Sequence, residues 1–116
     1  MSAIRNTEGY MAKLTLGKAE CKARILDIDQ NGFAVYMKSP LPPKTMIRVC
    51  IDLGEAGVLN VLAYTSSCVL RGPALHRIGF VFSVMENNEY TILQNAIEMF
   101  RGTLTVAERL SLATVH

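Results

Sequence analysis

The chain has 116 residues, of which 50% are apolar and 19% are charged, and its formal net charge is +2. A chain of this length and apolar content can bury one hydrophobic core, which excludes a disordered protein and a miniprotein held together by disulfides. No apolar run approaches the ~18 residues of a membrane helix, and the first residues lack a basic start followed by an apolar stretch, so we expect no membrane span, no signal peptide and a cytoplasmic location.

Three strands are predicted in the first third of the sequence. Residues 10–16 and 18–25 alternate between apolar and polar side chains, which is typical of a sheet with one face in water. Residues 33–37 form a short β-rich run. Residues 39–43 contain three prolines, which cannot donate to a sheet ladder, so we expect a loop there.

Three more strands follow this loop. Residues 46–53 alternate again, residues 58–70 predict a long strand that bends or bulges near 65–67, and residues 75–82 return. Short connections indicate that neighbouring strands are antiparallel, and such meanders commonly close because closure removes exposed edges. The sequence therefore predicts a mainly β fold, with a six-stranded antiparallel barrel over residues 10–82.

The periodicity becomes helical after the last strand. Residues 83–86 match a capping box, and a helix is predicted over about 85–101, with Gly102 as its end. The expected core-facing stripe of this helix consists of Leu93, Ala96, Ile97 and Phe100.

A short additional helix is predicted beyond Gly102, because residues 105–108 form a second capping box. We therefore divide the chain into an N-terminal segment at 1–9, a barrel with its helix at 10–101, and a C-terminal helical extension at 102–116.

Patterns typical of catalytic or metal sites do not occur in the sequence. It contains no P-loop, no H-E-x-x-H and no G-x-S-x-G motif. None of the three cysteines belongs to a C-x-x-C pair, and we expect all three to be reduced. We expect a protein that is not an enzyme and that binds no metal.

The basic residues are concentrated in the first part of the chain. Residues 1–84 carry ten Lys and Arg against six Asp and Glu, whereas residues 85–116 carry two against four. This surplus is modest for a partner such as duplex nucleic acid but sufficient for one small phosphate ligand.

The segment DIDQNGFAV, residues 27–35, places two carboxylates directly before an Asn-Gly pair. Asn-Gly is the strongest short hairpin signal, because Asn31 and Gly32 both tolerate a positive φ. Asp27 and Asp29 would share one face of a continuing strand. A structural interpretation also remains open, in which both carboxylates cap turn amides.

Two segments of this pattern resemble motifs of PilZ domains. Residues 27–32, D-I-D-Q-N-G, are similar to the D/N-x-S-x-x-G motif, and residues 77–82, R-I-G-F-V-F, resemble the "vGi.F" strand of the family. The order of strands, proline loop and helix also agrees over roughly residues 10–101. The resemblance implies a six-stranded barrel that binds cyclic di-GMP and relays it to a partner without being an enzyme. It further implies a two-part ligand site, made by an R-x-x-x-R motif before the barrel and by the D-x-S-x-x-G turn.

Both parts of that ligand site are altered in this sequence. Asp29 stands where the motif has Ser, so a hydroxyl donor is replaced by a carboxylate that would face a ligand with two phosphates. The segment before the barrel contains Arg5 alone, with no second Arg four residues away. The candidate ligand-binding residues, from the resemblance and from nearby basic side chains, are Asp27, Asp29, Gly32, Arg24, Lys22 and Arg5.

The leading hypothesis is a non-enzymatic PilZ-like adaptor of bacterial cyclic di-GMP signalling, with ligand binding weakened or lost and action through protein contact. The alternative is a working cyclic di-GMP receptor with an unorthodox site that uses Arg5, Lys22 or Arg24. A third hypothesis is a small barrel that binds single-stranded nucleic acid, which would need exposed aromatic residues. The aromatic residues expected mostly in the core instead are Phe33, Tyr36, Phe80 and Phe82.

A protein partner or self-association is predicted to use residues 92–112, because this region has more apolar residues than one core-facing stripe requires. The open alternative is that the extension packs back onto the barrel. The candidate interface residues are Ile92, Met99, Leu104, Leu110 and Leu112.

Overall fold

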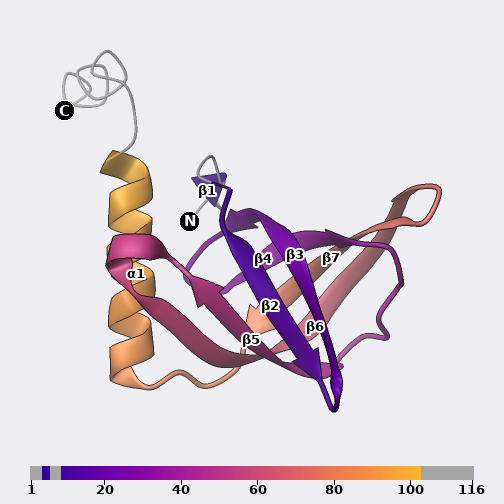
Figure 1. Cartoon of the computed structure of the whole chain (residues 1–116), viewed down its shortest axis with the longest axis horizontal. Coiled ribbons are helices and arrows are strands. Elements are labelled where there is room, and N and C mark those ends of the chain that lie inside the picture. Colours follow the sequence, from indigo (N-terminus) through magenta and orange to yellow (C-terminus); the bar gives the residue numbers. More distant parts are fainter. Residues whose placement is uncertain (1–3, 6–8, 103–116) are drawn as a thin grey trace.

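Six antiparallel strands form a closed barrel, as the sequence predicts (Figure 1). The computed structural model describes residues 4–5 and 9–102 of the chain. The ring order is β3-β2-β5-β6-β7-β4, and pairing between β3 and β4 closes it. The strands are β2 (Met11–Leu16), β3 (Ala19–Ile28), β4 (Gly32–Met37), β5 (Met46–Asp52), β6 (Val58–Gly72) and β7 (Leu75–Phe82).

A further short strand, β1 (Ile4–Arg5), pairs antiparallel with the end of β3. Its register sets Ile4 opposite Ile28 and Arg5 opposite Asp27. The segment before the barrel is therefore joined to the barrel at the strand that carries the first carboxylate of the DIDQNG motif.

The interior of the barrel is filled by the alternate residues that the sequence predicts. On β5, Ile47, Val49 and Ile51 are buried, whereas Arg48 and Asp52 are exposed. Three aromatic rings also lie inside, with ring centroids 5.0 Å apart for Phe33 and Phe80 and 5.6 Å apart for Phe33 and Phe82. The expectation that Tyr36 is also core is wrong, because 42% of this residue is exposed on the outer face of β4.

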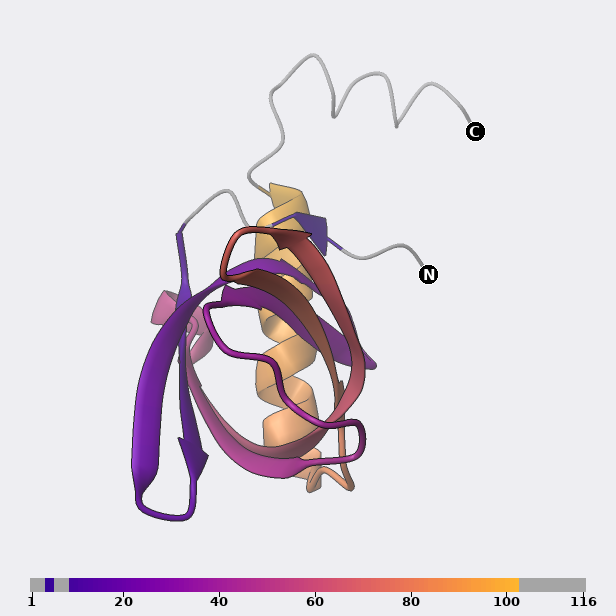
Figure 2. The same cartoon turned by 90° about the vertical axis from the view of Figure 1, so that its right-hand side faces the viewer.

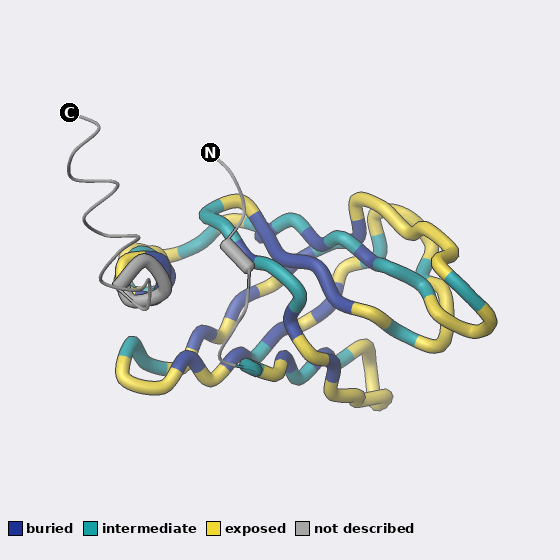
Figure 3. Tube along the Cα trace, turned by 90° about the horizontal axis from the view of Figure 1, so that it is seen from above, coloured by how far each residue is buried: buried dark blue, intermediate teal, exposed yellow. Residues whose placement is uncertain are grey.

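The helix α1 (Asn87–Gly102) lies along one end of the barrel, next to β6 and the 3-10 turn η1 (Gly54–Ala56) (Figures 1 and 2). Leu93, Ala96 and Ile97 are buried, as predicted. Figure 3 shows α1 end-on at one end of the molecule, away from the exposed hairpin loops at the other.

The helix begins later than the sequence predicts. Ser83, directly after the last residue of β7, donates its backbone N–H to the carbonyl of Leu62 at 2.8 Å, and residues 83–86 have no regular secondary structure. The predicted capping box at residues 83–86 is therefore wrong, and the first helical residue is Asn87.

The strand β6 is the longest in the barrel and is irregular where the sequence predicts it. Its register with β7 shifts between Thr65 and Ser67 and again between Leu70 and Gly72. Beyond the first shift, the β6–β7 hairpin extends away from the barrel on the side opposite α1 (Figure 1). The side chain of Thr65 is buried and accepts a hydrogen bond from Thr45 N–H while donating to the carbonyl of Pro42, which ties the proline loop to β6.

The turn between β3 and β4 differs from the expected Asn-Gly hairpin. In the described residues, a positive φ occurs at Lys44 and Ala74 and at four glycines, but not at Asn31 or Gly32. The β3–β4 connection instead spans residues 29–31, and Asp29 N–H donates to the carbonyl of Gly32 at 2.9 Å.

Candidate functional site

A shallow pocket of about 220 Å³ lies on the barrel surface where β3, β4 and β7 meet. Both predicted carboxylates, Asp27 and Asp29, and the predicted glycine, Gly32, line it. The lining also includes Ala34 and Gly79, which have small or no side chains. The complete lining is Asp27, Asp29, Asn31, Gly32, Phe33, Ala34, Arg77, Gly79, Phe80 and Val81.

An ion pair crosses this pocket. The Nη2 atom of Arg77, on β7, donates to Oδ2 of Asp27, on β3, over 2.8 Å, and the two side chains are 34% and 31% exposed. Because the pair is partly shielded from water, its attraction is screened less than that of a fully exposed pair. Arg77 is the first residue of the RIGFVF segment but is not among the predicted site residues. The only sequence signal for it is its place as the first residue of that segment.

The second carboxylate holds the turn together. Oδ1 of Asp29 accepts hydrogen bonds from the N–H groups of Asn31 at 2.7 Å and Gly32 at 2.9 Å. This is an Asx-type cap, which compensates backbone donors that a tight connection leaves without a strand partner. Asp29 therefore caps turn amides, as the structural interpretation predicts for both carboxylates. Asp27 instead pairs with Arg77, and no hydrogen bond from a turn amide to Asp27 is found in the described residues.

The need for glycine at position 32 comes from the barrel itself. A Cβ atom added to Gly32 would lie 1.9 Å from the carbonyl oxygen of Phe80 and 3.1 Å from Cα of Val81. The backbones of β4 and β7 approach too closely at this point for any side chain. The same residue also donates its N–H to Asp29, so one glycine serves both the turn and the strand pairing.

The predicted basic residues are not brought together. Lys22 and Arg24 are exposed on β3, opposite Lys13 and Met11 of β2, and neither lines the pocket. The backbone of Arg5 lies opposite Asp27 in the β1–β3 register. Of the residues that the structure describes along the pocket wall, Arg77 alone is basic, so the lining has two carboxylates, one guanidinium group and a net charge of −1.

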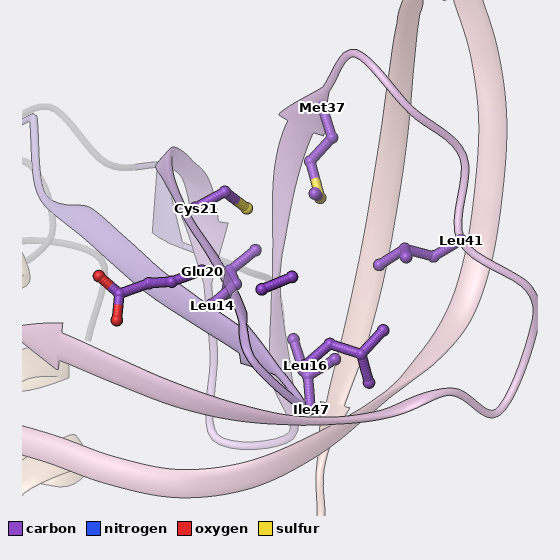
Figure 4. A pocket seen from close by; sticks show the side chains of 8 residues that line it. Leu14, Leu16, Glu20, Cys21, Met37, Leu41 and Ile47 are labelled. Atoms are coloured by element: carbon purple, nitrogen blue, oxygen red, sulfur yellow. The ribbon is translucent and has the colours of Figure 1, made fainter.

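A second, apolar pocket of about 150 Å³ opens between the β2–β3 hairpin, the end of β4 and the proline loop (Figure 4). Its sulfur atoms come from Cys21 and Met37, and its single charged group, the Glu20 carboxylate, points away from the apolar side chains. Such a lining offers no group that would hold a phosphate. The apolar side chains that form it include Leu14, Leu16, Leu41 and Ile47.

The predicted interface residues fall mostly outside the described part of the chain. Ile92 is half-buried on α1 and packs against the core. Its side-chain carbons lie 3.5–3.6 Å from the position that a Cβ atom added to Gly57 would occupy. Met99 belongs to α1, but its side chain lies outside the description, as do Leu104, Leu110 and Leu112. An interface at residues 92–112 stays a prediction.

Metal-binding and membrane-spanning features are not found in the described residues. No group of three or more His, Cys, Asp or Glu side chains there could hold a metal ion. None of the helices in residues 4–5 and 9–102 has the length and apolar character to cross a bilayer.

The shape of the barrel and helix matches solved structures despite low sequence identity. No protein-family model matches the sequence, and no curated protein matches it. Among solved structures, YcgR from Escherichia coli in complex with c-di-GMP has a TM-score of 0.75 at 18% identity, covering 99% of this chain and 49% of YcgR. The separate PilZ domain of YcgR with c-di-GMP gives a TM-score of 0.68 at 17% identity, covering 85% of this chain and 86% of that domain.

Two other structures give the same result. MrkH of K. pneumonia in its apo state has a TM-score of 0.73 at 14% identity, with 85% of this chain and 49% of MrkH covered. The Bacillus subtilis inhibitor of motility MotI/DgrA has a TM-score of 0.72 at 13% identity, with 90% of this chain and 53% of MotI covered. The chain thus spans about half the length of YcgR, MrkH and MotI. With its closed six-stranded barrel and C-terminal helix, it has the fold of a PilZ domain.

Proposed function

We propose that this chain is a non-enzymatic module of bacterial cyclic di-GMP (c-di-GMP) signalling that binds the nucleotide weakly and acts through protein contact. The proposal is supported by the fold, which is shared with structures that contain c-di-GMP. The observation that carries it is the Asp27–Arg77 ion pair, because the basic residue of the pocket already has a carboxylate partner.

The charge of the pocket opposes a ligand with two phosphates. At about 4–6 Å and an effective dielectric near 20, each contact between like charges costs on the order of 3–4 kcal/mol before screening. A phosphate that approached Arg77 would also have to displace Asp27 from it. Both effects weaken binding relative to a pocket with free, charge-assisted donors.

A pair of isosteric variants tests this explanation. Asp27→Asn frees the Arg77 guanidinium group from its carboxylate partner, and Asp29→Asn removes the second charge while keeping the oxygen that caps the turn. The double variant changes the charge of the lining from −1 to +1. We expect calorimetric titration to show c-di-GMP binding at least about tenfold tighter than to the native chain, equivalent to about 1.4 kcal/mol. Equal or weaker binding to the double variant would contradict the proposal that pocket charge sets the affinity.

A working receptor with an unorthodox site is the second candidate, and the β1–β3 register favours it. That register holds the backbone of Arg5 opposite Asp27, next to the pocket wall. Arg5→Ala should then weaken c-di-GMP binding at least about tenfold, whereas Arg24→Ala, which changes an exposed Arg outside the lining, should leave it unchanged. Equal, weak titrations for the native chain and both variants would favour the adaptor.

The predicted protein contact has its own test. Deleting residues 103–116 should reduce capture of partner proteins from cell extract if residues 92–112 carry the interface. A truncated chain that is less stable but captures the same partners would show that the extension only packs against the barrel.

A further inference from the structure

The outer half of β6 has a neighbour on one side only. Its pairing with β5 ends where Tyr64 lies opposite Met46, and Thr65 still exchanges backbone hydrogen bonds with Lys44 and Thr45. Residues 66–72 then pair with β7 alone in the described part of the chain. The opposite edge of this segment is open.

The direction of the backbone groups along this edge follows from two hydrogen bonds at the C-terminal end of β7. Phe82 N–H donates to Asn31 on the β4 side, whereas Ser83 N–H donates to Leu62 on the β6 side. Because the bonding direction alternates along a strand, the odd-numbered residues of β7 bond to β6. Arg77 is odd-numbered and lies opposite Val69, so the backbone groups of Val69 point to β7.

The neighbours of Val69 consequently point their backbone groups the other way. Cys68 and Leu70 each direct one N–H and one C=O to the open edge. The side chains there are unusually apolar for an unprotected edge, since Val69 is 43% and Leu70 is 66% exposed. Natural proteins usually guard such edges with charges or proline, and residues 66–70 contain neither.

We propose that residues 66–70 form a self-association site, at which a second copy of the chain pairs antiparallel about a two-fold axis through Val69. Cys68 then lies opposite Leu70 of the partner subunit, and the reverse pair is identical. Each of these two pairs exchanges two backbone hydrogen bonds, so all the open groups of Cys68 and Leu70 are satisfied.

A second copy of the chain meets the hydrogen-bonding and charge requirements of this edge. The two open residues are symmetric about Val69, so an identical segment returns each donor to an acceptor without a gap. The register also brings no like charges together, because Arg71 lies opposite Ser67 of the partner subunit. Val69 meets its own counterpart in a non-hydrogen-bonded pair, where side chains approach most closely.

Disulfide trapping tests the register directly. In a background with Cys21, Cys50 and Cys68 changed to Ser, Val69→Cys places two thiols face to face on the axis, at a Cα separation of about 4.5 Å that a disulfide can bridge. Leu62→Cys is the matched control, because Leu62 is also 43% exposed on β6 but lies where β5 covers the edge. We expect mild oxidation to give a covalent dimer with Val69→Cys and several-fold less with Leu62→Cys; equal yields would overturn the proposal.

Sedimentation velocity of the native-cysteine chain under reducing conditions gives the second readout. We expect the mass to rise from 12.8 kDa toward twice that value between about 1 μM and about 1 mM. Val69→Lys, which sets two ammonium groups together, should raise the dimer dissociation constant at least about tenfold, while Leu62→Lys should not. A chain that remains monomeric throughout, or a dimer that survives Val69→Lys and is lost on deleting residues 103–116, would overturn the proposal.

Discussion

At the scale of single residues, the fold alone requires a glycine at position 32, whether or not a ligand binds. In the motif that the sequence resembles, a glycine at this place would let a ligand approach closely. The structure supplies a sufficient reason inside the barrel, because the space for a Cβ is already occupied by the carbonyl oxygen of Phe80 at 1.9 Å. The presence of this glycine therefore does not indicate that a ligand binds.

Substitution of this glycine should destabilise the barrel whether or not nucleotide is present. We expect Gly32→Ala to lower the free energy of unfolding by about 3 kcal/mol, because the backbones of β4 and β7 must separate. Gly72→Ala is the control, since the nearest atom to its added Cβ is 4.0 Å away, and it should change stability by less than about 0.5 kcal/mol. Urea unfolding measures both values, and similar losses for the two variants would contradict the steric explanation.

The carboxylate of Asp29 has a structural role that can be separated from its charge. Its Oδ1 atom accepts from two backbone N–H groups, so Asp29→Ala leaves both without a partner and should cost about 1–2 kcal/mol of unfolding free energy. Asp29→Asn keeps an oxygen in the same place and should cost less than half as much. Thermal unfolding of the two variants decides this, and an Asn variant as unstable as the Ala variant would mean that the charge matters more than the cap.

At the scale of elements, one buried hydroxyl fixes the proline loop to the longest strand. Thr65→Val keeps the side-chain shape but removes the acceptor for Thr45 N–H and the donor to Pro42. We expect a loss of about 2–3 kcal/mol in unfolding free energy, because these backbone groups are left unsatisfied. Thr91→Val, on the exposed face of α1, should cost less than about 0.5 kcal/mol.

A strand was predictable where each of its two faces keeps the same environment along the whole strand. The alternation of β5 predicted its buried residues correctly, because one face meets the core and the other meets water. The start of α1 was not predictable in this way. Residues 83–86 have a good local helix signal, but the hydrogen bond from Ser83 to Leu62 holds the start of that segment against β6, and the segment remains irregular.

At the scale of the whole molecule, the site depends on contacts between distant parts of the sequence. Asp27 and Arg77 are 50 residues apart, and Gly32 and Phe80 are 48 apart, so no local pattern could reveal either contact. The motif predicted which turn would carry the pocket. It could not predict that the basic residue of the pocket would already be paired.

We propose that the charges of the pocket lined by Asp27, Asp29 and Arg77 keep c-di-GMP from binding tightly to this PilZ-fold barrel. The most direct measurement is calorimetric titration of the native chain with c-di-GMP at physiological salt. We expect no detectable heat of binding or a dissociation constant above about 10 μM, equivalent to less than about 7 kcal/mol of binding free energy. A dissociation constant below about 1 μM, with one nucleotide or one nucleotide dimer bound per chain, would contradict the claim.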